Sequence, residues 1–274
     1  MLTGDTFDLT ARIITLLSDF GLKDPYVAEM KAVISTISPE AKIIDISHDV
    51  YKFNIRMGAF VLASATGYFP KGTVHVAVVD PGVGTKRRGI VIVTAHAVYI
   101  GPDNGVLMLA AARERIRHVY AITNSRLMLP QVSSTFHGRD VFAPVAAHVA
   151  NGTPPSKVGP EITDYTIPKF ASPSLKSGKL TGEILHIDDF GNIITNIASA
   201  DLDKLGVKNE SRLKIAMRDN AIEVKFRKTY GDAPRGTILT LIGSHDFLEV
   251  AINQDNAAKR QKIEVGDIVA VEKA

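Results

Sequence analysis

The segment TVHVAVVDPGVG, residues 73–84, joins a short apolar run to a carboxylate and a glycine-rich turn. Residues 73–79 have the length and β-branched composition of a buried strand, and Asp80 follows at the point where that strand would end. Similar runs alternate with helical segments up to about residue 150, which is typical of an α/β domain with a largely parallel sheet. Ligands bind such sheets outside the carboxyl ends of the strands. The segment therefore predicts both a sheet and a functional edge.

The same alternation predicts the other elements of this first domain. Strands are expected at residues 13–17, 42–46, 73–79, 89–95 and 98–101. Helices are expected at residues 25–37, 55–68, 106–115 and 140–151. Polar loops with glycine or proline follow three of the strands, namely SDFG at 18–21, DPG at 80–82 and GPDNG at 101–105. These loops are the first candidates for chemistry, because loops at strand ends carry side chains without disturbing the core.

The pattern changes after Gly178 to short apolar runs separated by turn residues. The runs are residues 180–187, 193–197, 212–216, 221–226, 237–242, 247–252 and 268–271. Their spacing predicts a small antiparallel β-barrel or sandwich with few helices. A proline- and glycine-rich stretch precedes them at 151–178. We therefore expect an α/β domain at 13–170, a linker at 171–177 and a β domain at 178–274.

Composition excludes several classes of protein. Of 274 residues, 45% are hydrophobic and 22% charged, which is ordinary for a globular chain. The net charge of +3 comes from interspersed residues and does not indicate a nucleic-acid groove. The absence of cysteine excludes disulfides, thiolate zinc sites and cysteine nucleophiles.

Localisation and metal binding can also be addressed from the sequence. No segment approaches the roughly 18 apolar residues of a membrane span, and no signal-peptide run opens the chain, so we expect a cytoplasmic protein with no membrane partner. No histidine pair has zinc-ligand spacing. We therefore expect no catalytic metal and no cofactor.

Asp19, Arg87 and His137 of the first domain each allow a functional and a structural interpretation. Asp19 follows a strand and could accept hydrogen bonds from two ribose hydroxyls, or could be a turn acid before the next helix. Arg87 lies seven residues after Asp80, so its guanidinium could return to that carboxylate or form a surface ion pair. Arg88 competes for the same role. His137, in SSTFHGRD at 133–140, could be a catalyst or a capping residue.

Two turns of the second domain also allow both a functional and a structural interpretation. The turn DDFGN at 188–192 suits a hairpin, but Phe190 and Asn192 also offer a ring for the face of a purine and an amide for its polar edge. Ser244 lies in a second polar turn. Glu249 stands alone in an apolar strand, where the alternation could direct it to solvent.

Four ordered motifs together resemble one family. They are SDFGLKDPY at 18–26, VDPGVG at 79–84, TFHGRD at 135–140 and DDFGNIITNI at 188–197. The chain is similar to the S-adenosylmethionine hydroxide adenosyltransferases, which are adenosine-forming hydrolases related to fluorinase and chlorinase. The resemblance covers essentially the whole chain from residue 13 to residue 271.

The resemblance implies a role for each matching position. A catalytic triad is implied at Asp80, Arg87 and His137, in which Arg87 favours a hydroxide-like water while the other two orient the water and accept its proton. The resemblance also implies substrate-binding residues. Asp19 would bind the ribose, and Phe53, Phe190 and Asn192 the nucleoside. Asp24, Asp188 and Ser244 would lie near the methionine portion, and we also include Glu249. His245 stands where the halogenating relatives have an arginine. The family also implies a homotrimer whose sites lie between subunits.

Two departures from the halogenating relatives indicate the nucleophile. Asp80 stands where those relatives have a tyrosine, and Gly138 where they have a serine that contacts halide. Both departures favour water, so we expect hydrolysis of S-adenosylmethionine at C5′ by nucleophilic substitution, giving adenosine and L-methionine. The alternatives are a halide-using adenosyltransferase, a non-catalytic sensor of adenosine or S-adenosylmethionine, and a plain interaction protein.

Overall fold

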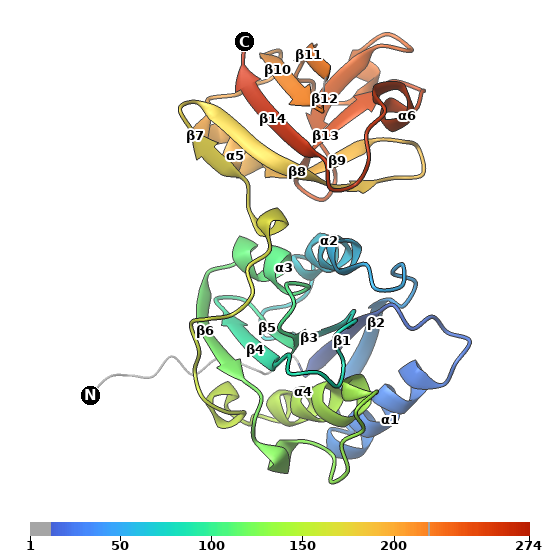
Figure 1. Cartoon of the computed structure of the whole chain (residues 1–274), viewed down its shortest axis with the longest axis vertical. Coiled ribbons are helices and arrows are strands. Elements are labelled where there is room, and N and C mark those ends of the chain that lie inside the picture. Colours follow the sequence, from blue (N-terminus) through green and yellow to red (C-terminus); the bar gives the residue numbers. More distant parts are fainter. Residues whose placement is uncertain (1–11, 219) are drawn as a thin grey trace. The chain divides into compact units, whose positions relative to one another are not determined.

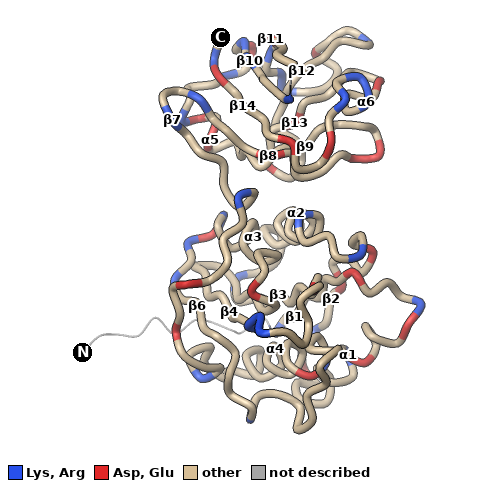
Figure 2. Tube along the Cα trace, viewed as in Figure 1, with Lys and Arg blue, Asp and Glu red and all other residues tan. Residues whose placement is uncertain are grey.

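The computed structural model describes residues 12–218 and 220–274, which form two compact units. The units meet between Pro168 and Lys169, and each has its own hydrophobic core (Figure 1). Basic and acidic residues are interspersed along the trace of both units (Figure 2). Among the described residues, no helix is long and apolar enough to cross a membrane.

The first unit is built on a six-stranded sheet in the order β2-β1-β3-β5-β4-β6. The strands are β1 (Ile13–Ser18), β2 (Lys42–Ser47), β3 (Val74–Val78), β4 (Gly89–Thr94), β5 (Val98–Pro102) and β6 (Ile116–Ala121). The pairings among β2, β1, β3 and β5 are parallel, whereas β4 pairs antiparallel with β5 and β6. Every residue of β3 is buried, as expected of a central parallel strand covered on both faces. The expected α/β fold with a largely parallel sheet is confirmed.

Helices cover both faces of this sheet (Figure 1). They are α1 (Tyr26–Ile37), α2 (Ile55–Thr66), α3 (Met108–Arg113) and α4 (Ala143–Ala150). Helix α1 packs against α4, and α2 against α3. The buried residues of α1 are Val27, Met30 and Ile34, whose spacing places them on one helical face. A π-helical turn, Gly138–Phe142, precedes α4 directly after His137.

The second unit is an antiparallel, nearly closed barrel in the order β11-β10-β14-β8-β9-β13-β12. Its strands are β7 (Ser174–Lys176), β8 (Lys179–Ile187), β9 (Ile193–Ala198), β10 (Arg212–Met217), β11 (Asn220–Lys225), β12 (Ile238–Ile242), β13 (Phe247–Ile252) and β14 (Ile268–Lys273). A bridge from Phe226 to Thr240 joins the β11 and β12 ends of the sheet. Two short helices, α5 (Ser199–Lys204) and α6 (Ala257–Gln261), complete the unit. The antiparallel β domain that was expected as a barrel or a sandwich is confirmed, and it is a nearly closed barrel.

Short elements differ from the sequence-based expectation. Strand β6 was not expected, because its charged and exposed edge positions conceal an apolar pattern. The stretch 171–177, expected as a linker, contains β7, which pairs with β8. Short 3₁₀ turns lie at Ser125–Leu127, Pro155–Lys157, Lys169–Ala171 and Tyr230–Asp232. The mismatches fall where tertiary pairing rather than local periodicity decides the conformation.

One close strand approach supplies a test of the packing. A Cβ added at Gly101 in β5 would lie 2.4 Å from the backbone oxygen of Ala77 in β3. Gly101→Ala should therefore lower the free energy of unfolding by about 1–3 kcal/mol, measured by urea denaturation. Gly67→Ala is the matched control, because nothing lies within 4 Å of its added Cβ. Equal unfolding midpoints for the two variants would contradict this packing.

Candidate active site

Asp80, Arg87 and His137 lie together at the carboxyl end of β3. Arg87 Nε donates to Asp80 Oδ1 at 2.8 Å, and Arg87 Nη2 makes a second hydrogen bond to Asp80 Oδ2. Arg87 Nη2 also lies 2.9 Å from His137 Nδ1. The Asp80 and Arg87 side chains are only 4% and 12% exposed, which makes this a shielded ion pair. Three residues far apart in sequence thus form one polar cluster.

The glycine-rich turn between Asp80 and Arg87 makes this geometry possible. Gly84 has a φ of +75°, and a Cβ there would lie 2.1 Å from the backbone oxygen of Ser134. Glycine is therefore required both for the left-handed backbone and for the approach of the segment that precedes His137. Thr85 Oγ1 donates to Gly82 O at 2.7 Å and tightens the turn. The turn serves to return Arg87 to Asp80, and it carries no phosphate-binding sequence.

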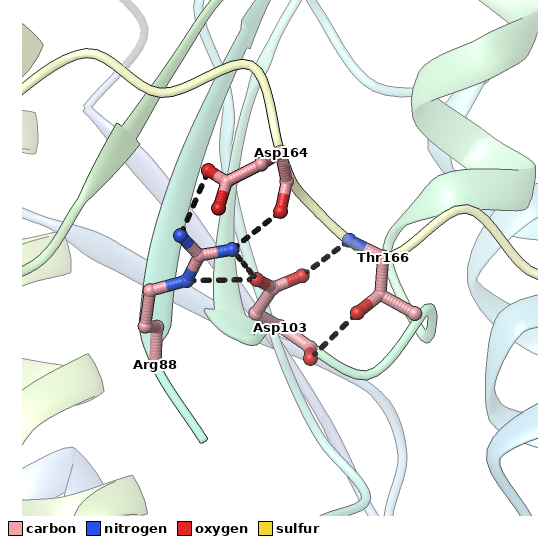
Figure 3. Close-up of polar contacts among 4 residues, drawn as sticks. All are labelled: Arg88, Asp103, Asp164 and Thr166. Carbon is pink, nitrogen blue, oxygen red and sulfur yellow. Dashed lines mark hydrogen bonds and ion pairs between the residues drawn. The ribbon is translucent and has the colours of Figure 1, made fainter. Parts of the chain in front are cut away.

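The neighbouring Arg88 is engaged elsewhere (Figure 3). Its Nη2 donates to Asp103 Oδ2 at 2.8 Å, and its Nη1 to Asp164 Oδ1 at 2.9 Å. Thr166 N in turn donates to Asp103 Oδ1 at 2.8 Å. Arg88 therefore anchors the segment around residue 164 to the end of β5, and of the two adjacent arginines it is Arg87 that contacts Asp80 and His137.

The contact with Arg87 determines which nitrogen of His137 carries a proton. A guanidinium only donates hydrogen bonds, so Nδ1 of His137 is the acceptor and the proton of the neutral ring is on Nε2. Burial, followed by the positive charge of Arg87, lowers the pKa of His137, while Asp80 and Asp140 act in the opposite direction. At neutral pH the ring is therefore uncharged and presents an N–H donor. This differs from the expectation that His137 accepts the proton of water.

Aromatic packing holds the segment that carries His137. The rings of Phe20, Tyr26 and Phe136 form a cluster with centroid separations of 5.1–5.8 Å. Arg139 lies over the Phe136 ring and pairs with Asp140, which is fully buried. These contacts fix the π-helical turn, a feature frequent at functional sites.

Gly138 follows His137 in a tightly packed position. A Cβ added there would meet Phe136, Met30 and Phe20 at 3.2–3.4 Å. A serine at this position would therefore require its neighbours to shift. The local packing therefore favours a residue without a side chain at this position.

A cavity of about 350 Å³ opens at this edge of the first unit. Five residues expected in the site line it: Asp19, Asp24, Phe53, Asp80 and His137. Asp19 is 6% exposed, and its Oδ2 accepts a 2.8 Å hydrogen bond from Phe53 N. Phe53 itself is 68% exposed and has a φ of +64°. Tyr26 and Lys52 also line the cavity, although neither was among the expected site residues.

A second cavity, of about 680 Å³, lies in the barrel unit. Its lining includes Asp188, Phe190 and Asn192, as expected. Asp188 Oδ1 accepts from the backbone N–H of Phe190 at 3.0 Å and of Asn192 at 2.8 Å, and Asp188 Oδ2 accepts from Asn192 Nδ2 at 2.9 Å. Asp188 therefore shapes the turn and orients Asn192, while the Phe190 ring is 80% exposed.

Glu249 is buried, not directed to solvent as the strand alternation allowed. It is 6% exposed and accepts a 2.6 Å hydrogen bond from Tyr230 Oη. Burial raises the pKa of Glu249, and the negative charge of Asp188 acts in the same direction. A Cβ at Gly243 would lie 1.8 Å from Glu249 Oε1, so that glycine makes room for the carboxylate. Glu249 reaches the cavity through Tyr230, a lining residue that sequence analysis missed.

Ser244 lies in the turn between β12 and β13, a few positions before Glu249 in sequence. Within residues 12–218 and 220–274, no group of three or more His, Asp or Glu side chains is arranged to hold a metal ion. The candidate site residues thus fall mainly around two cavities, one in each unit.

Fold and site define a two-domain α/β and β-barrel protein with a carboxylate–guanidinium–imidazole cluster. Residues 14–159 match the SAM hydroxide adenosyltransferase N-terminal domain, and residues 182–270 match its C-terminal domain. The chain belongs to the SAM hydroxide adenosyltransferase family, which confirms the resemblance of the motifs.

Curated relatives cover nearly the full length of the chain. A Thermus thermophilus protein named (R)-S-adenosyl-L-methionine hydrolase is 37% identical over 262 residues, covering 93% of this chain and 97% of its own. A protein of that name from Methanocaldococcus jannaschii is 38% identical, covering 94% and 95%. A fluorinase from an Actinoplanes species is more distant, at 28% identity, covering 96% and 98%.

Solved structures agree with the fold. The crystal structure of an uncharacterized conserved protein from Thermotoga maritima superimposes with a TM-score of 0.83 at 38% identity, covering 95% of this chain and 100% of that one. The crystal structure of a conserved hypothetical protein from Thermus thermophilus superimposes with a TM-score of 0.75 at 35% identity, covering 95% and 99%.

The His137 titration tests the electrostatics of the cluster. In the wild type, the His137 ring should titrate below 6.5, because burial and Arg87 lower its pKa. Arg87→Met should raise that pKa, since the variant removes the nearby positive charge and leaves Asp80. Long-range ¹H–¹⁵N NMR of the ring measures both values, and His137→Asn assigns the signal. Arg88→Met is the control and should leave the titration unchanged; an unaltered pKa in Arg87→Met would refute the arrangement.

Proposed function

We propose that this protein hydrolyses S-adenosylmethionine at C5′ to adenosine and L-methionine. The observation that carries the proposal is the buried Asp80–Arg87 pair with His137, on a cavity that Asp19 also lines. The names of the curated relatives support the same substrate and reaction.

The chemistry needs little beyond a positioned water. The positively charged sulfonium of the substrate departs as a neutral thioether, so water attacking C5′ in line forms the C–O bond as the C–S electron pair returns to sulfur. In our proposal the Nε2–H of His137 orients the water and Asp80 accepts its proton, which then passes to solvent. Arg87 stabilises the developing hydroxide electrostatically. A positioned base of this kind contributes about 10²–10⁴-fold.

We propose that residues around both cavities recognise the substrate. In the proposal, Asp19 binds the ribose hydroxyls and Phe53 packs against the nucleoside. Phe190 and Asn192 hold the adenine, a role supported by their position on the barrel cavity. Asp24, Asp188 and Ser244 face the methionine portion. Glu249 contributes by orienting Tyr230.

The nucleophile in this proposal is water, not halide. The carboxylate of Asp80 lines the cavity, where it can accept a proton from an attacking water, whereas a halide has no proton to lose. The sulfonium leaving group makes a metal or redox cofactor unnecessary, so we propose none. We also propose a cytoplasmic location, because S-adenosylmethionine is a metabolite of the cell interior.

A homotrimer completes the proposal. Each unit presents a highly exposed aromatic ring at its cavity, Phe53 in the first and Phe190 in the second. Exposed rings of this size are typical of surfaces that a ligand or partner covers. We propose that the first unit of one subunit and the second unit of a neighbour enclose the substrate together, as the family resemblance implies.

The reaction is tested by its products. Purified protein incubated with S-adenosylmethionine should release adenosine and methionine in equal amounts, whether or not chloride is present. Chromatography identifies the products, and each sulfonium epimer is supplied separately because the relatives' names specify the R form. A chlorinated deoxyadenosine would indicate the halide reaction instead. Tight binding with no consumption would indicate a sensor.

Matched arginine variants form the control for this test. Arg87→Ala should keep adenosine binding but lose about 10²-fold or more in kcat. Arg88→Ala should stay within a few-fold of wild type, because Arg88 contacts Asp103 and Asp164 and not the cluster. Asp80→Ala with the wild-type rate would rule out the proposed base.

Subunit complementation tests the shared site. Asp80→Ala and Phe190→Ala chains should each be impaired, but their co-expression should restore part of the activity in mixed trimers, since some sites then combine two intact halves. Mass from light scattering reports the assembly. No recovery in verified mixed trimers would mean that each site is formed within one chain.

A further inference from the structure

A chain of polar side chains runs behind the Asp19 turn. Ser18, the last residue of β1, places its Oγ 2.7 Å from His48 Nδ1. The other ring nitrogen of His48, Nε2, lies 3.2 Å from Asp45 Oδ1, within ion-pair distance although outside regular hydrogen-bond geometry. Asp45 Oδ2 accepts from Lys31 Nζ at 2.6 Å. The series connects α1, β2 and the end of β1.

The ring of His48 is buried, whereas Asp45 and Lys31 at the other end of this series are partly exposed to solvent. Ser18 is fully buried and His48 is 4% exposed. The side chains of Asp45 and Lys31 are 36% and 38% exposed. Although partial burial acts to raise it, the contacts with Lys31 and His48 lower the pKa of Asp45, so its carboxylate is charged at neutral pH. A charged anchor near the surface thus holds a buried imidazole.

This arrangement of serine, histidine and aspartate is not a nucleophilic triad. Ser18 does not line the cavity, and its Oγ also accepts a 3.3 Å hydrogen bond from Phe20 N. A catalytic serine must present its oxygen to a substrate. The hydroxyl of Ser18 instead faces the protein interior, so its contacts serve structure around Asp19.

His48 also holds the backbone on both sides of Asp19. Its carbonyl oxygen accepts a 2.8 Å hydrogen bond from Gly21 N, on the far side of the turn. The segment that follows His48 returns to Asp19, where Lys52 Nζ donates to the Asp19 carbonyl and Phe53 N donates to the Asp19 carboxylate at 2.8 Å. These hydrogen bonds join the turn at 18–21 to the loop at 48–53, and we call this set of contacts the clasp.

The clasp keeps Phe53 in an unfavourable conformation. Its φ of +64° lies in the left-handed region, which a bulky residue rarely adopts. Such a residue persists only where its surroundings determine it, and the positions concerned cluster at ligand sites. The bond from Phe53 N to Asp19 depends on this conformation. Loosening the clasp would release both residues from the cavity wall.

We propose that His48 is a positioning residue for the ribose site, where it holds Ser18 and the 18–21 turn so that the Asp19 carboxylate faces the cavity. The inference rests on the proposed function, because it takes the Asp19 ligand to be the ribose diol. Removal of the His48 ring should therefore weaken substrate binding and leave the chemical step unchanged.

Loss of a contact to the ribose should change KM and not kcat. A hydrogen bond to the ribose hydroxyls is made equally in the bound substrate and in the transition state, so its loss raises KM and leaves kcat nearly unchanged. His48→Ala should raise KM for S-adenosylmethionine, and Kd for adenosine by calorimetry, about tenfold. His48→Asn keeps an acceptor near the Nδ1 position and should recover most of that loss. His118→Ala removes an exposed histidine paired with Glu161 and is the matched control.

An analogue makes the test specific. Adenosine and 2′,3′-dideoxyadenosine are compared as ligands, because the second lacks the hydroxyls that Asp19 would bind. The defect of His48→Ala should appear with adenosine and disappear with the dideoxy compound. Equal defects with both ligands, or a kcat defect without a KM defect, would overturn the positioning role. Asp45→Asn, a change at a partly exposed residue, serves if His48→Ala does not fold, and should show the same pattern more weakly.

Hydrogen exchange gives a readout that does not require activity. The amides of Gly21 and Phe53 should exchange faster in His48→Ala than in His118→Ala, because only the first variant loses the ring contact with Ser18 that holds the 18–21 turn. Unchanged protection would overturn the inference whatever the protein catalyses. Wild-type protein that leaves S-adenosylmethionine intact would instead contradict the proposed function, and the exchange result would still decide the role of His48.

Discussion

The shielded pair of Asp80 and Arg87 is the interaction on which the rest of the site depends. Both side chains are nearly removed from water, and burying either charge alone would be strongly unfavourable. Each therefore requires the other, and the two-point contact sets the direction of both groups. Arg87 then determines the tautomer of His137, because it occupies Nδ1. It also lies 5.3 Å from the centre of the buried Phe142 ring, which couples the cluster to the core.

The surrounding backbone is organised to bring that pair together. The sharp turn after β3 needs Gly84, both for its left-handed conformation and for its contact with the Ser134 backbone. The segment before α4 is held by an aromatic cluster and by the buried Asp140. The adjacent Arg88 takes a purely architectural position at Asp103. Two consecutive arginines thus have separate tasks, because neighbouring side chains near a strand point in different directions.

In both of the turns that we propose to bind substrate, a carboxylate organises nearby backbone. Asp19 accepts from Phe53, and Asp188 accepts from Phe190 and Asn192. In each case the hydrogen bonds leave an aromatic ring exposed beside a polar group. Holding these groups before a ligand arrives reduces the ordering cost of binding. The buried Glu249 acts similarly on Tyr230, and His48 on the Asp19 turn.

Local sequence was sufficient for most of the architecture. Alternating apolar runs and helical periods indicated the sheet, the helices and the barrel, because these periodicities record which faces are buried. Four motifs indicated the family and contain most of the residues that line the first cavity, but only Asp188, Phe190 and Asn192 of the second. Only the folded chain showed strands β6 and β7, the burial of Glu249 and its contact with Tyr230. It also showed that Arg87, and not Arg88, contacts Asp80 and His137. Each of these depends on contacts between residues distant in sequence, and no local pattern reports where a side chain will find its partner.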